Sequence, residues 1–135
     1  MASPAISLDE VIAVAHFRAA LRVFLRTTEK KARRNGLTPQ RYQLLLMVKG
    51  APDRSESLTV TDLADRLQVA QSTATELVTR AEEAGLVQRS GSPKDGRVAL
   101  VRLTGAGEEL LSACFRDLQE ERDQLLASVT ALRDR

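Results

Sequence analysis

A run of four short segments between Leu58 and Thr104 most constrains what this chain can fold into. Apolar residues recur at helical spacing in the first two segments, and the last two are typical of short strands. The segments span residues 59–67, 71–84, 86–90 and 97–103. Gln68 and Val69 turn the chain between the helices, and a turn rich in Gly, Pro and Asp separates the strands. This order predicts a winged helix-turn-helix, in which a β-hairpin follows two closely connected helices.

A long helix is expected near the N-terminus. Ser7 and Glu10 have the spacing of a capping box, in which each side chain bonds to the backbone amide of the other residue. Apolar residues then recur at helical spacing from Leu8 until Asn35 and Gly36 offer a left-handed stop. The pattern predicts a helix of about 27 residues, roughly 40 Å long at a rise of 1.5 Å per residue.

A second helix is expected before the four-segment unit. Thr38 is a good N-cap, and Pro39 suits the first turn, where its missing N–H costs nothing. Gly50 ends this helical pattern. Residues 50–57 are rich in Gly, Pro, Asp and Ser, and they predict an exposed loop.

The C-terminal part predicts one more long helix. Thr104 can cap it, and no Pro or Gly interrupts the chain from Glu108 onward. Its apolar stripe consists of Leu111, Cys114, Leu118, Leu125, Val129 and Leu132. Exposure of this stripe and that of the first helix to water would cost about 25 cal/mol per Å². We therefore expect the two long helices to pack on each other and on the same pair from a second copy of the chain.

Length and composition favour one domain over residues 1–135, because 43% of the residues are hydrophobic and 28% are charged. The expected architecture is mainly α with a small β-hairpin wing, a winged helix-turn-helix with long N- and C-terminal dimerisation helices. Residues 37–104, which we call the head, would form the winged helix-turn-helix. Residues 7–36 and 105–135, which we call the base, would form the dimerisation part.

Several classes of protein are disfavoured by what the sequence lacks. No apolar run reaches the roughly 18 residues that cross a bilayer, and the N-terminus has no signal-peptide pattern. We therefore expect a cytoplasmic protein without a membrane partner. One Cys, Cys114, and one His, His16, allow neither an internal disulfide nor a zinc site, so no metal or cofactor is expected. No arrangement of a nucleophile, base or phosphate-binding Gly loop indicates an enzyme.

The helix expected at residues 71–84 has one apolar and one polar side. The apolar side is formed by Ala74, Leu77, Val78 and Ala81. The polar side carries Gln71, Ser72, Thr73, Thr75, Glu76, Thr79 and Arg80. Short hydrogen-bonding side chains let a helix backbone approach base edges closely. A polar side is equally typical of any amphipathic helix, but the hairpin directly after this one favours the DNA-reading interpretation.

An ordered set of residues runs through the span 58–107. It consists of Leu63-Ala64, Ser72-Thr73, Gly85-Leu86-Val87, Arg89, Asp95, Arg97, Leu103-Thr104 and Gly107. As a set, these residues resemble the bacterial MarR family of transcription regulators. The resemblance implies that the helix at 71–84 enters the DNA major groove, so that its seven polar residues are candidate DNA contacts.

The resemblance also implies a role for the hairpin tip. Arg97 would reach into the adjacent minor groove, and Asp95 would orient it. A narrow minor groove concentrates negative potential, and a guanidinium held by a carboxylate loses less rotamer freedom on docking. An exposed ion pair without DNA contact is the alternative for these two residues. Gly96 stands where many family members have a second Arg, so the expected DNA affinity is either lower or relies on Lys94 for the phosphate contact.

Dimerisation through both ends of the chain is a further implication of the resemblance. A two-fold dimer would present two heads about one helical turn apart, roughly 34–36 Å, to a palindromic operator. Occupation of a promoter in this way favours repression, with activation as the alternative. Many family members release DNA when a small aromatic acid binds between base and head, and Arg18, Arg22 and Tyr42 are the candidate contacts for such a phenolic ligand.

The charge distribution leaves an alternative open. The net charge is only +2, and residues 58–90 carry three basic against five acidic residues. This acidic balance favours a winged-helix module for protein association that does not bind DNA, whereas Arg80, Arg97 and the polar helix side favour DNA.

Three other features have plain structural interpretations. Cys114 falls on the apolar stripe and is expected to be a buried thiol. His16 is expected to be a partly exposed side chain. Lys30, Lys31, Arg33 and Arg34 can contact phosphate, but cations also favour the C-terminal end of a helix through its dipole, which is the preferred interpretation.

Overall fold

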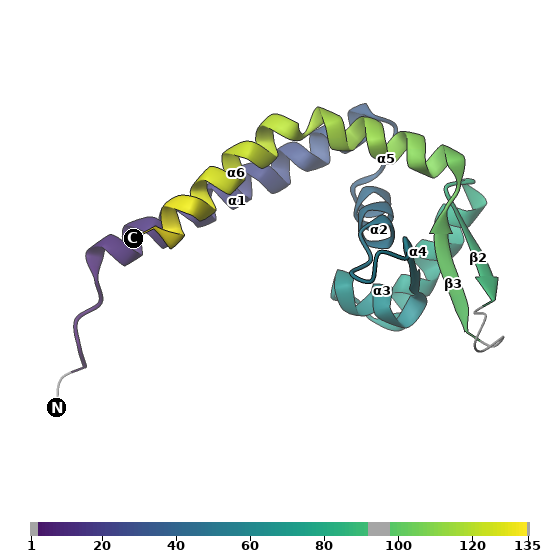
Figure 1. Cartoon of the computed structure of the whole chain (residues 1–135), viewed down its shortest axis with the longest axis horizontal. Helices are drawn as coiled ribbons and strands as arrows, with labels where there is room; N and C mark the ends of the chain where they lie inside the picture. The colour runs from purple at the N-terminus through teal and green to yellow at the C-terminus, as the bar shows by residue number, and fades with distance from the viewer. Residues whose placement is uncertain (1–2, 92–97, 135) are drawn as a thin grey trace.

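The computed structural model describes residues 3–91 and 98–134. Its elements are α1 (Leu8–Arg34), α2 (Pro39–Lys49), β1 (Ser57–Thr59), α3 (Val60–Leu67), α4 (Gln71–Glu83), β2 (Val87–Gly91), β3 (Ala99–Leu103), α5 (Gly105–Asp117) and α6 (Gln119–Arg133). Helices α1 and α6 lie side by side along a long arm, and the other elements gather at one end of it (Figure 1). The mainly helical winged-helix architecture predicted from the sequence is confirmed.

The N-terminal helix has the predicted bounds. The Ser7 hydroxyl accepts a hydrogen bond from the backbone N–H of Glu10 at 3.3 Å, as the predicted cap requires. Asn35 caps the C-terminal end, and Gly36 follows with φ +84°, a conformation that favours glycine. The expected packing of α1 against the C-terminal helix within one chain is also confirmed (Figure 1).

The prediction of one uninterrupted C-terminal helix is wrong, because the helix breaks at Leu118 between α5 and α6. Leu118 is fully buried and has φ −98° and ψ 9°. Side chains bind the carbonyls beside the break: the Lys31 ammonium donates to the carbonyl of Asp117 at 2.8 Å, and the Arg122 guanidinium donates to that of Phe115. These bonds satisfy carbonyl groups next to a helix interruption that Pro and Gly do not mark.

The helix-turn-helix forms as the sequence predicts. The Thr59 hydroxyl accepts from the backbone N–H of Asp62 at 3.1 Å and caps α3. Gln68 ends α3 in the left-handed region, with φ 57°, and turns the chain toward α4. On α4, the inner residues Ala74, Val78 and Ala81 are fully buried and Leu77 is half-buried.

The expectation of an exposed loop over residues 50–57 is partly wrong. Ala51 and Ser57 are buried, and Ser57 opens β1, a strand that the sequence pattern did not predict. β1 pairs antiparallel with β3, where Leu58 lies opposite Val101, and β3 also pairs with β2, so the sheet order is β1-β3-β2. A three-residue strand is too short for its period to be recognised, and its partner lies about forty positions further along the chain.

The hydrophobic core joins the head to the base. It contains residues of α2, α3, α4 and the sheet together with Ala32 of α1 and Leu111, Cys114 and Leu118 from the C-terminal part. Cys114 is completely buried, as predicted, and burial raises the pKa of its thiol. The base and the head therefore share one core within the described residues.

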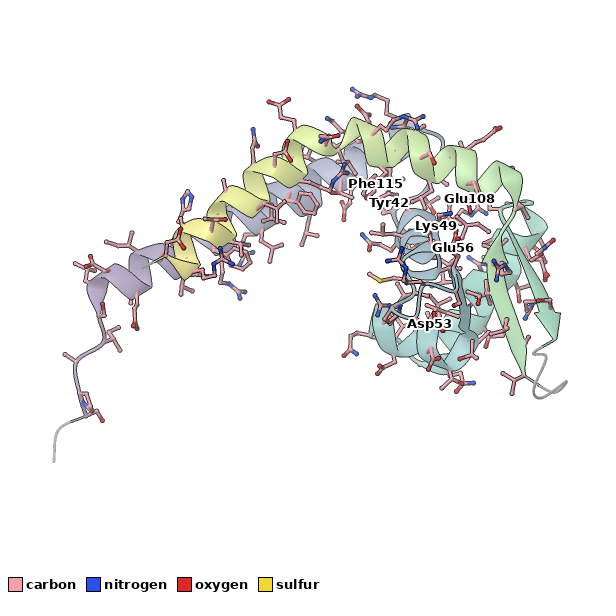
Figure 2. All side chains as sticks on the ribbon, in the orientation of Figure 1. Tyr42, Lys49, Asp53, Glu56, Glu108 and Phe115 are labelled. Carbon is pink, nitrogen blue, oxygen red and sulfur yellow. The ribbon has the colours of Figure 1, made fainter. Side chains whose placement is uncertain are left out.

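An ion-pair cluster connects α2, the following loop and α5. The Lys49 ammonium donates to Glu56 and, at 2.9 Å, to Glu108, and Figure 2 shows the three side chains together. The two carboxylates raise the pKa of Lys49 through these hydrogen bonds. The cluster connects the head to the start of α5.

Candidate nucleic-acid interface

The polar side of α4 is open to solvent, as the sequence predicts. Six of its residues are exposed: Gln71, Ser72, Thr73, Thr75, Glu76 and Arg80. Thr79, the seventh candidate, is half-buried. The fold thus brings six of the candidate contacts to one accessible helix surface.

The N-terminal end of α4 differs from those of four other helices. Hydroxyl side chains cap α1, α2, α3 and α5, and these are Ser7, Thr38, Thr59 and Thr104. Helix α4 begins after Ala70, whose side chain makes no cap bond. The first backbone N–H groups of α4 therefore lack a side-chain acceptor, and the helix dipole gives this end a partial positive charge. Both properties suit a phosphate oxygen.

Two of the three threonines on α4 bond to their own helix. The Thr75 hydroxyl donates to the carbonyl of Gln71 at 3.0 Å, and the Thr79 hydroxyl donates to that of Thr75 at 2.9 Å. Because each hydroxyl proton is engaged, the groups left for a ligand are oxygen lone pairs and methyl groups. Thr75 can therefore accept a hydrogen bond from a base or contact a thymine methyl.

A strand residue whose contacts the sequence did not reveal holds α4 in place. Arg89 of β2 donates from Nη2 to Glu82 Oε1 and to Thr79 Oγ1, each at 3.1 Å, and its backbone N–H donates to Glu82 Oε2 at 3.1 Å. These bonds hold the pKa of the Glu82 carboxyl below its ordinary value. The sequence pointed to Arg89 only through its place in the ordered motif. Periodicity shows which face of an element is buried, but it does not show that a strand residue bonds to a helix.

The other charged pair on α4 lies within the helix. Arg80 Nη2 donates to Glu76 Oε1 at 2.5 Å, and both side chains are largely exposed. The single cation on the polar side of α4 thus has a carboxylate beside it.

The predicted hairpin is present up to its tip. Gly91 of β2 lies opposite Ala99 of β3, which is the pair nearest to the tip within the described residues. Lys94, Asp95 and Arg97, the candidate contacts of the wing, lie outside the described residues. Their roles stay predictions.

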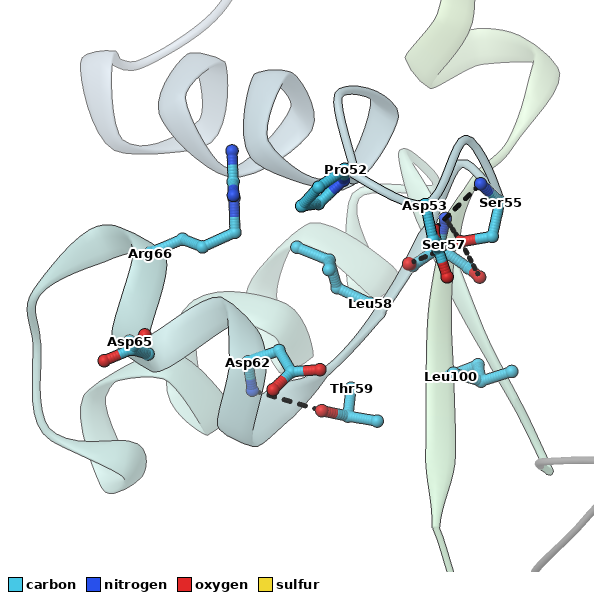
Figure 3. Close-up of a pocket in the computed structure, with 10 residues that line it drawn as sticks. All are labelled: Pro52, Asp53, Ser55, Ser57, Leu58, Thr59, Asp62, Asp65, Arg66 and Leu100. Atoms are coloured by element: carbon cyan, nitrogen blue, oxygen red, sulfur yellow. Dashed lines mark hydrogen bonds between the residues drawn. The ribbon is translucent and has the colours of Figure 1, made fainter.

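A cavity of about 680 Å³ lies beside β1 and α3 (Figure 3). Its lining includes three carboxylates, those of Asp53, Asp62 and Asp65, and one cation, Arg66. The Ser55 side chain and backbone hold the pKa of Asp53 below its ordinary value, which keeps that carboxylate charged. A surface of this charge repels phosphate, so it does not suit an extension of the candidate interface on α4.

A second cavity, of about 350 Å³, lies where the base meets the head. It is lined by Leu25, Thr28 and Glu29 of α1, Pro39, Gln40 and Gln43 of α2, and Leu67, Val69 and Leu77 from the helix-turn-helix. None of the predicted ligand contacts, Arg18, Arg22 and Tyr42, is among these residues. Arg18 and Arg22 are exposed on α1, whereas Tyr42 is a core residue whose pKa is raised by burial.

Two of the four cations at the end of α1 are engaged within the chain. Lys31 bonds to both carboxylate oxygens of Glu121 at 2.9 Å, and Arg34 bonds to Asp117 at 2.7 Å. These ion pairs give Lys31 and Arg34 a structural role within the chain, and the expected interaction with the helix dipole stays a prediction. Lys30 and Arg33 are exposed, and so is His16.

Residues 3–91 and 98–134 contain neither a membrane-spanning helix nor a metal-binding cluster. No helix there is long and apolar enough to span a bilayer. No group of three or more His, Cys, Asp or Glu side chains there could hold a metal ion.

Comparison with known proteins by sequence gives one family and one relative. The model of the MarR family matches residues 35–98. The uncharacterized HTH-type transcriptional regulator YdgJ of Bacillus subtilis (strain 168) is 29% identical over 96 residues, which are 71% of this chain and 56% of YdgJ. The chain thus matches just over half the length of this relative.

Comparison by structure extends the similarity to the base helices. Wild-type MarR of E. coli has a TM-score of 0.69 at 22% identity, over 91% of this chain and 85% of that one. A mutant of E. coli MarR complexed with operator DNA has a TM-score of 0.66 at 21% identity, over 90% and 85%. AbsC, a MarR family transcriptional regulator from Streptomyces coelicolor, has a TM-score of 0.63 at 24% identity, over 96% and 82%.

The structural matches establish the fold, and the family model covers most of the head. Of the motif residues, Leu63 and Ala64 lie in α3, Ser72 and Thr73 in α4, Val87 and Arg89 in β2, Leu103 in β3 and Gly107 in α5. The chain therefore resembles the MarR family over residues 35–98 and has the winged-helix fold of the MarR structures.

Proposed function

We propose that this chain is a DNA-binding transcription regulator that inserts α4 into the major groove. The observation that carries the proposal combines two features of α4. No side chain caps its N-terminal end, and one exposed side of the helix carries mostly short polar side chains. The first attracts backbone phosphate, and the second allows close approach to base edges. The structural match to a MarR mutant complexed with operator DNA supports this assignment.

The active form in this proposal is a homodimer. Apolar side chains remain exposed along α1 and near the end of α6, and they are Leu8, Val11, Ile12, Val14, Val23, Leu25, Leu126 and Val129, with Ile6 before α1. Exposure of so many large apolar side chains to water is unfavourable, and it supports an association site here. A second copy brings the same surface, so a two-fold pair covers both.

Such a dimer would present two α4 helices to successive major grooves of a palindromic operator. Arg97, oriented by Asp95, would contact the minor groove beside each one, and Lys94 would contact phosphate. Occupation of a promoter by this dimer blocks polymerase, so we propose repression as its effect.

We further propose that the cavity between base and head takes a small effector that alters DNA binding. Residues of α1, α2 and the helix-turn-helix line it together, so a ligand there would change how the head sits on the base. Glu29 is the one charged residue of this lining, and no cation belongs to it. These features favour a neutral or cationic apolar molecule over the phenolic acid that the family resemblance suggested.

A protein-association module without DNA is the second candidate. The acidic cavity beside β1 and α3 favours it, because three carboxylates attract a cationic partner rather than nucleic acid (Figure 3).

One titration separates the two candidates. The full-length chain is titrated by fluorescence anisotropy against duplexes from the DNA that flanks its own gene and against a random duplex, between about 50 and 200 mM salt. A DNA-binding regulator should bind a flanking duplex more tightly than the random duplex, and its affinity should fall steeply as the salt concentration rises. If Arg97 contacts phosphate, Arg97→Ala should lower the slope of the logarithm of the binding constant against the logarithm of the salt concentration by about one unit. Absence of binding to every duplex at the lowest salt would refute the DNA proposal.

A further inference from the structure

The ion pair between Glu76 and Arg80 lies on the exposed surface of α4, one helical turn apart. Arg80 Nη2 donates to Glu76 Oε1 at 2.5 Å, and the side chains of Arg80 and Glu76 are 65% and 60% exposed. Within the described residues neither side chain makes another hydrogen bond or ion pair. The second oxygen of Glu76 and the other N–H groups of Arg80 are therefore available to a ligand.

The pair places hydrogen-bond donors directly beside an acceptor. A G·C pair in the major groove presents the complementary order, because guanine offers the acceptors N7 and O6 and cytosine offers its N4 donor. An A·T pair does not fit: the adenine amino group would face the guanidinium donors, and the O4 of thymine would face the carboxylate. The bond between Glu76 and Arg80 holds both side chains in this order before DNA arrives.

The carboxylate itself needs an explanation at this position. An exposed negative charge on a helix that approaches DNA is repelled by the phosphates. That repulsion is offset where the carboxylate accepts a hydrogen bond from the DNA, and the cytosine amino group is the major-groove donor that carboxylates accept from.

We propose that Glu76 and Arg80 act as one unit that selects a single G·C pair in each half of the bound DNA, with Arg80 on guanine and Glu76 on cytosine. The inference rests on the proposed placement of α4 in the major groove. It adds the identity of one base pair and the two side chains that select it.

The same ion pair has a simpler interpretation. Oppositely charged residues at positions i and i+4 also occur on exposed helices as pairs that contribute slightly to helix stability. In that case, replacement of either residue would change stability a little and leave base preference unchanged. The two interpretations therefore differ in a property that can be measured.

The experiment is a selection from a duplex library with about 20 randomised base pairs, enough for two half-sites one helical turn apart. The full-length chain, E76Q, R80K and the control E83Q are compared at low salt. Glu83 is an exposed carboxylate at the other end of α4 that makes no hydrogen bond or ion pair in the described part of the chain. Circular dichroism and thermal unfolding confirm that the variants are folded.

We expect E76Q to shift one position per half-site from G·C toward T·A, with adenine in the place of the cytosine, because an amide suits the N6 and N7 of adenine. R80K should lose the preference at the same position, since an ammonium lacks the fork of donors, and E83Q should select the wild-type sequence. Exchange of that base pair for A·T should weaken wild-type binding about fivefold or more.

A charge reversal tests the order of the groups rather than the charges. The double variant E76R/R80E keeps an ion pair and the net charge but exchanges donors and acceptor, so it should stay folded and lose the G·C preference.

Selection of the wild-type sequence by E76Q, R80K or the double variant would overturn the inference, as would effects of the two single variants at different positions. Wild-type protein that retains no duplex at all would instead refute the proposed DNA binding.

Discussion

Gly107 packs directly against the backbone of Leu86, so closely that a Cβ at residue 107 would lie 2.1 Å from the Leu86 carbonyl oxygen. That carbonyl cannot easily move, because it also accepts a hydrogen bond from the backbone N–H of Thr104 at 3.0 Å. The Thr104 hydroxyl in turn donates to the carbonyl of Gly85 at 2.6 Å. This close contact leaves no room for a side chain at residue 107, which explains why glycine belongs at this place in the motif.

Gly107→Ala should therefore destabilise the fold by about 1–3 kcal/mol, the usual range for an overpacked core position. Urea denaturation of both proteins measures the difference. Gly105→Ala is the matched control, since a Cβ there meets nothing within 4 Å in the same helical turn. The control should be neutral or slightly stabilising, through lower entropy of the unfolded chain. An equal loss of unfolding free energy in Gly107→Ala and Gly105→Ala would contradict the packing explanation.

Replacement of Glu82 should change how stability depends on pH. Bonds from Arg89 hold the Glu82 pKa below its ordinary value of 4.5, so their contribution is fully present above pH 4.5 and is lost as the pH falls through the folded-state value. The wild type should therefore exceed Glu82→Gln in unfolding free energy near pH 7, and this difference should shrink as the pH falls below 4.5. Urea denaturation at a series of pH values measures it. The control Glu83→Gln should show no such trend, and a constant difference for Glu82→Gln would count against the role of Arg89.

Two charges on the exposed apolar surface of the base should separate the proposed dimer without unfolding the chain. Ile12 and Leu126 are suitable because they are 57% and 62% exposed in one chain. The variant Ile12→Asp/Leu126→Asp should sediment as a monomer with an unchanged circular dichroism spectrum, since each carboxylate would be buried unpaired in the interface. Leu118 is unsuitable because it belongs to the protomer core.

Thr61→Asp adds a charge at an exposed position of α3 and should leave the dimer intact. If Ile12→Asp/Leu126→Asp still sediments as a stable dimer, the proposed interface is wrong.

An acidic residue in the first turn of α4 should move stability and DNA affinity in opposite directions. Ser72→Asp places a negative charge at a positive helix end and should stabilise the fold by about 0.3–1 kcal/mol. The same charge would repel phosphate and weaken binding, with the larger effect at low salt. Thermal unfolding and anisotropy titrations measure the two effects. The control Thr130→Asp, on an exposed part of α6, should leave DNA affinity nearly unchanged. If Ser72→Asp and Thr130→Asp change DNA affinity equally, the N-terminal end of α4 does not bind phosphate.

Local features of the candidate interface could be predicted from the sequence. The polar residues of α4 are exposed as a consequence of helical periodicity alone, because the apolar residues Ala74, Val78 and Ala81 turn the opposite side toward the core. The bond from Arg89 to Glu82 and Thr79 could not be predicted in this way, since it depends on how β2 lies against α4. The same is true of the cavity between base and head, whose lining comes from separate elements.

The sequence by itself determined where most helices begin and end. The hydroxyl caps at Ser7, Thr38, Thr59 and Thr104 act on amides three residues away, so they are encoded locally. Only the tertiary structure decided the β1 pairing, the break at Leu118 and the contact of Gly107 with Leu86. These depend on groups distant in the chain, whose approach is determined by burial of the shared core, and a local pattern carries no record of which distant partner satisfies a backbone group.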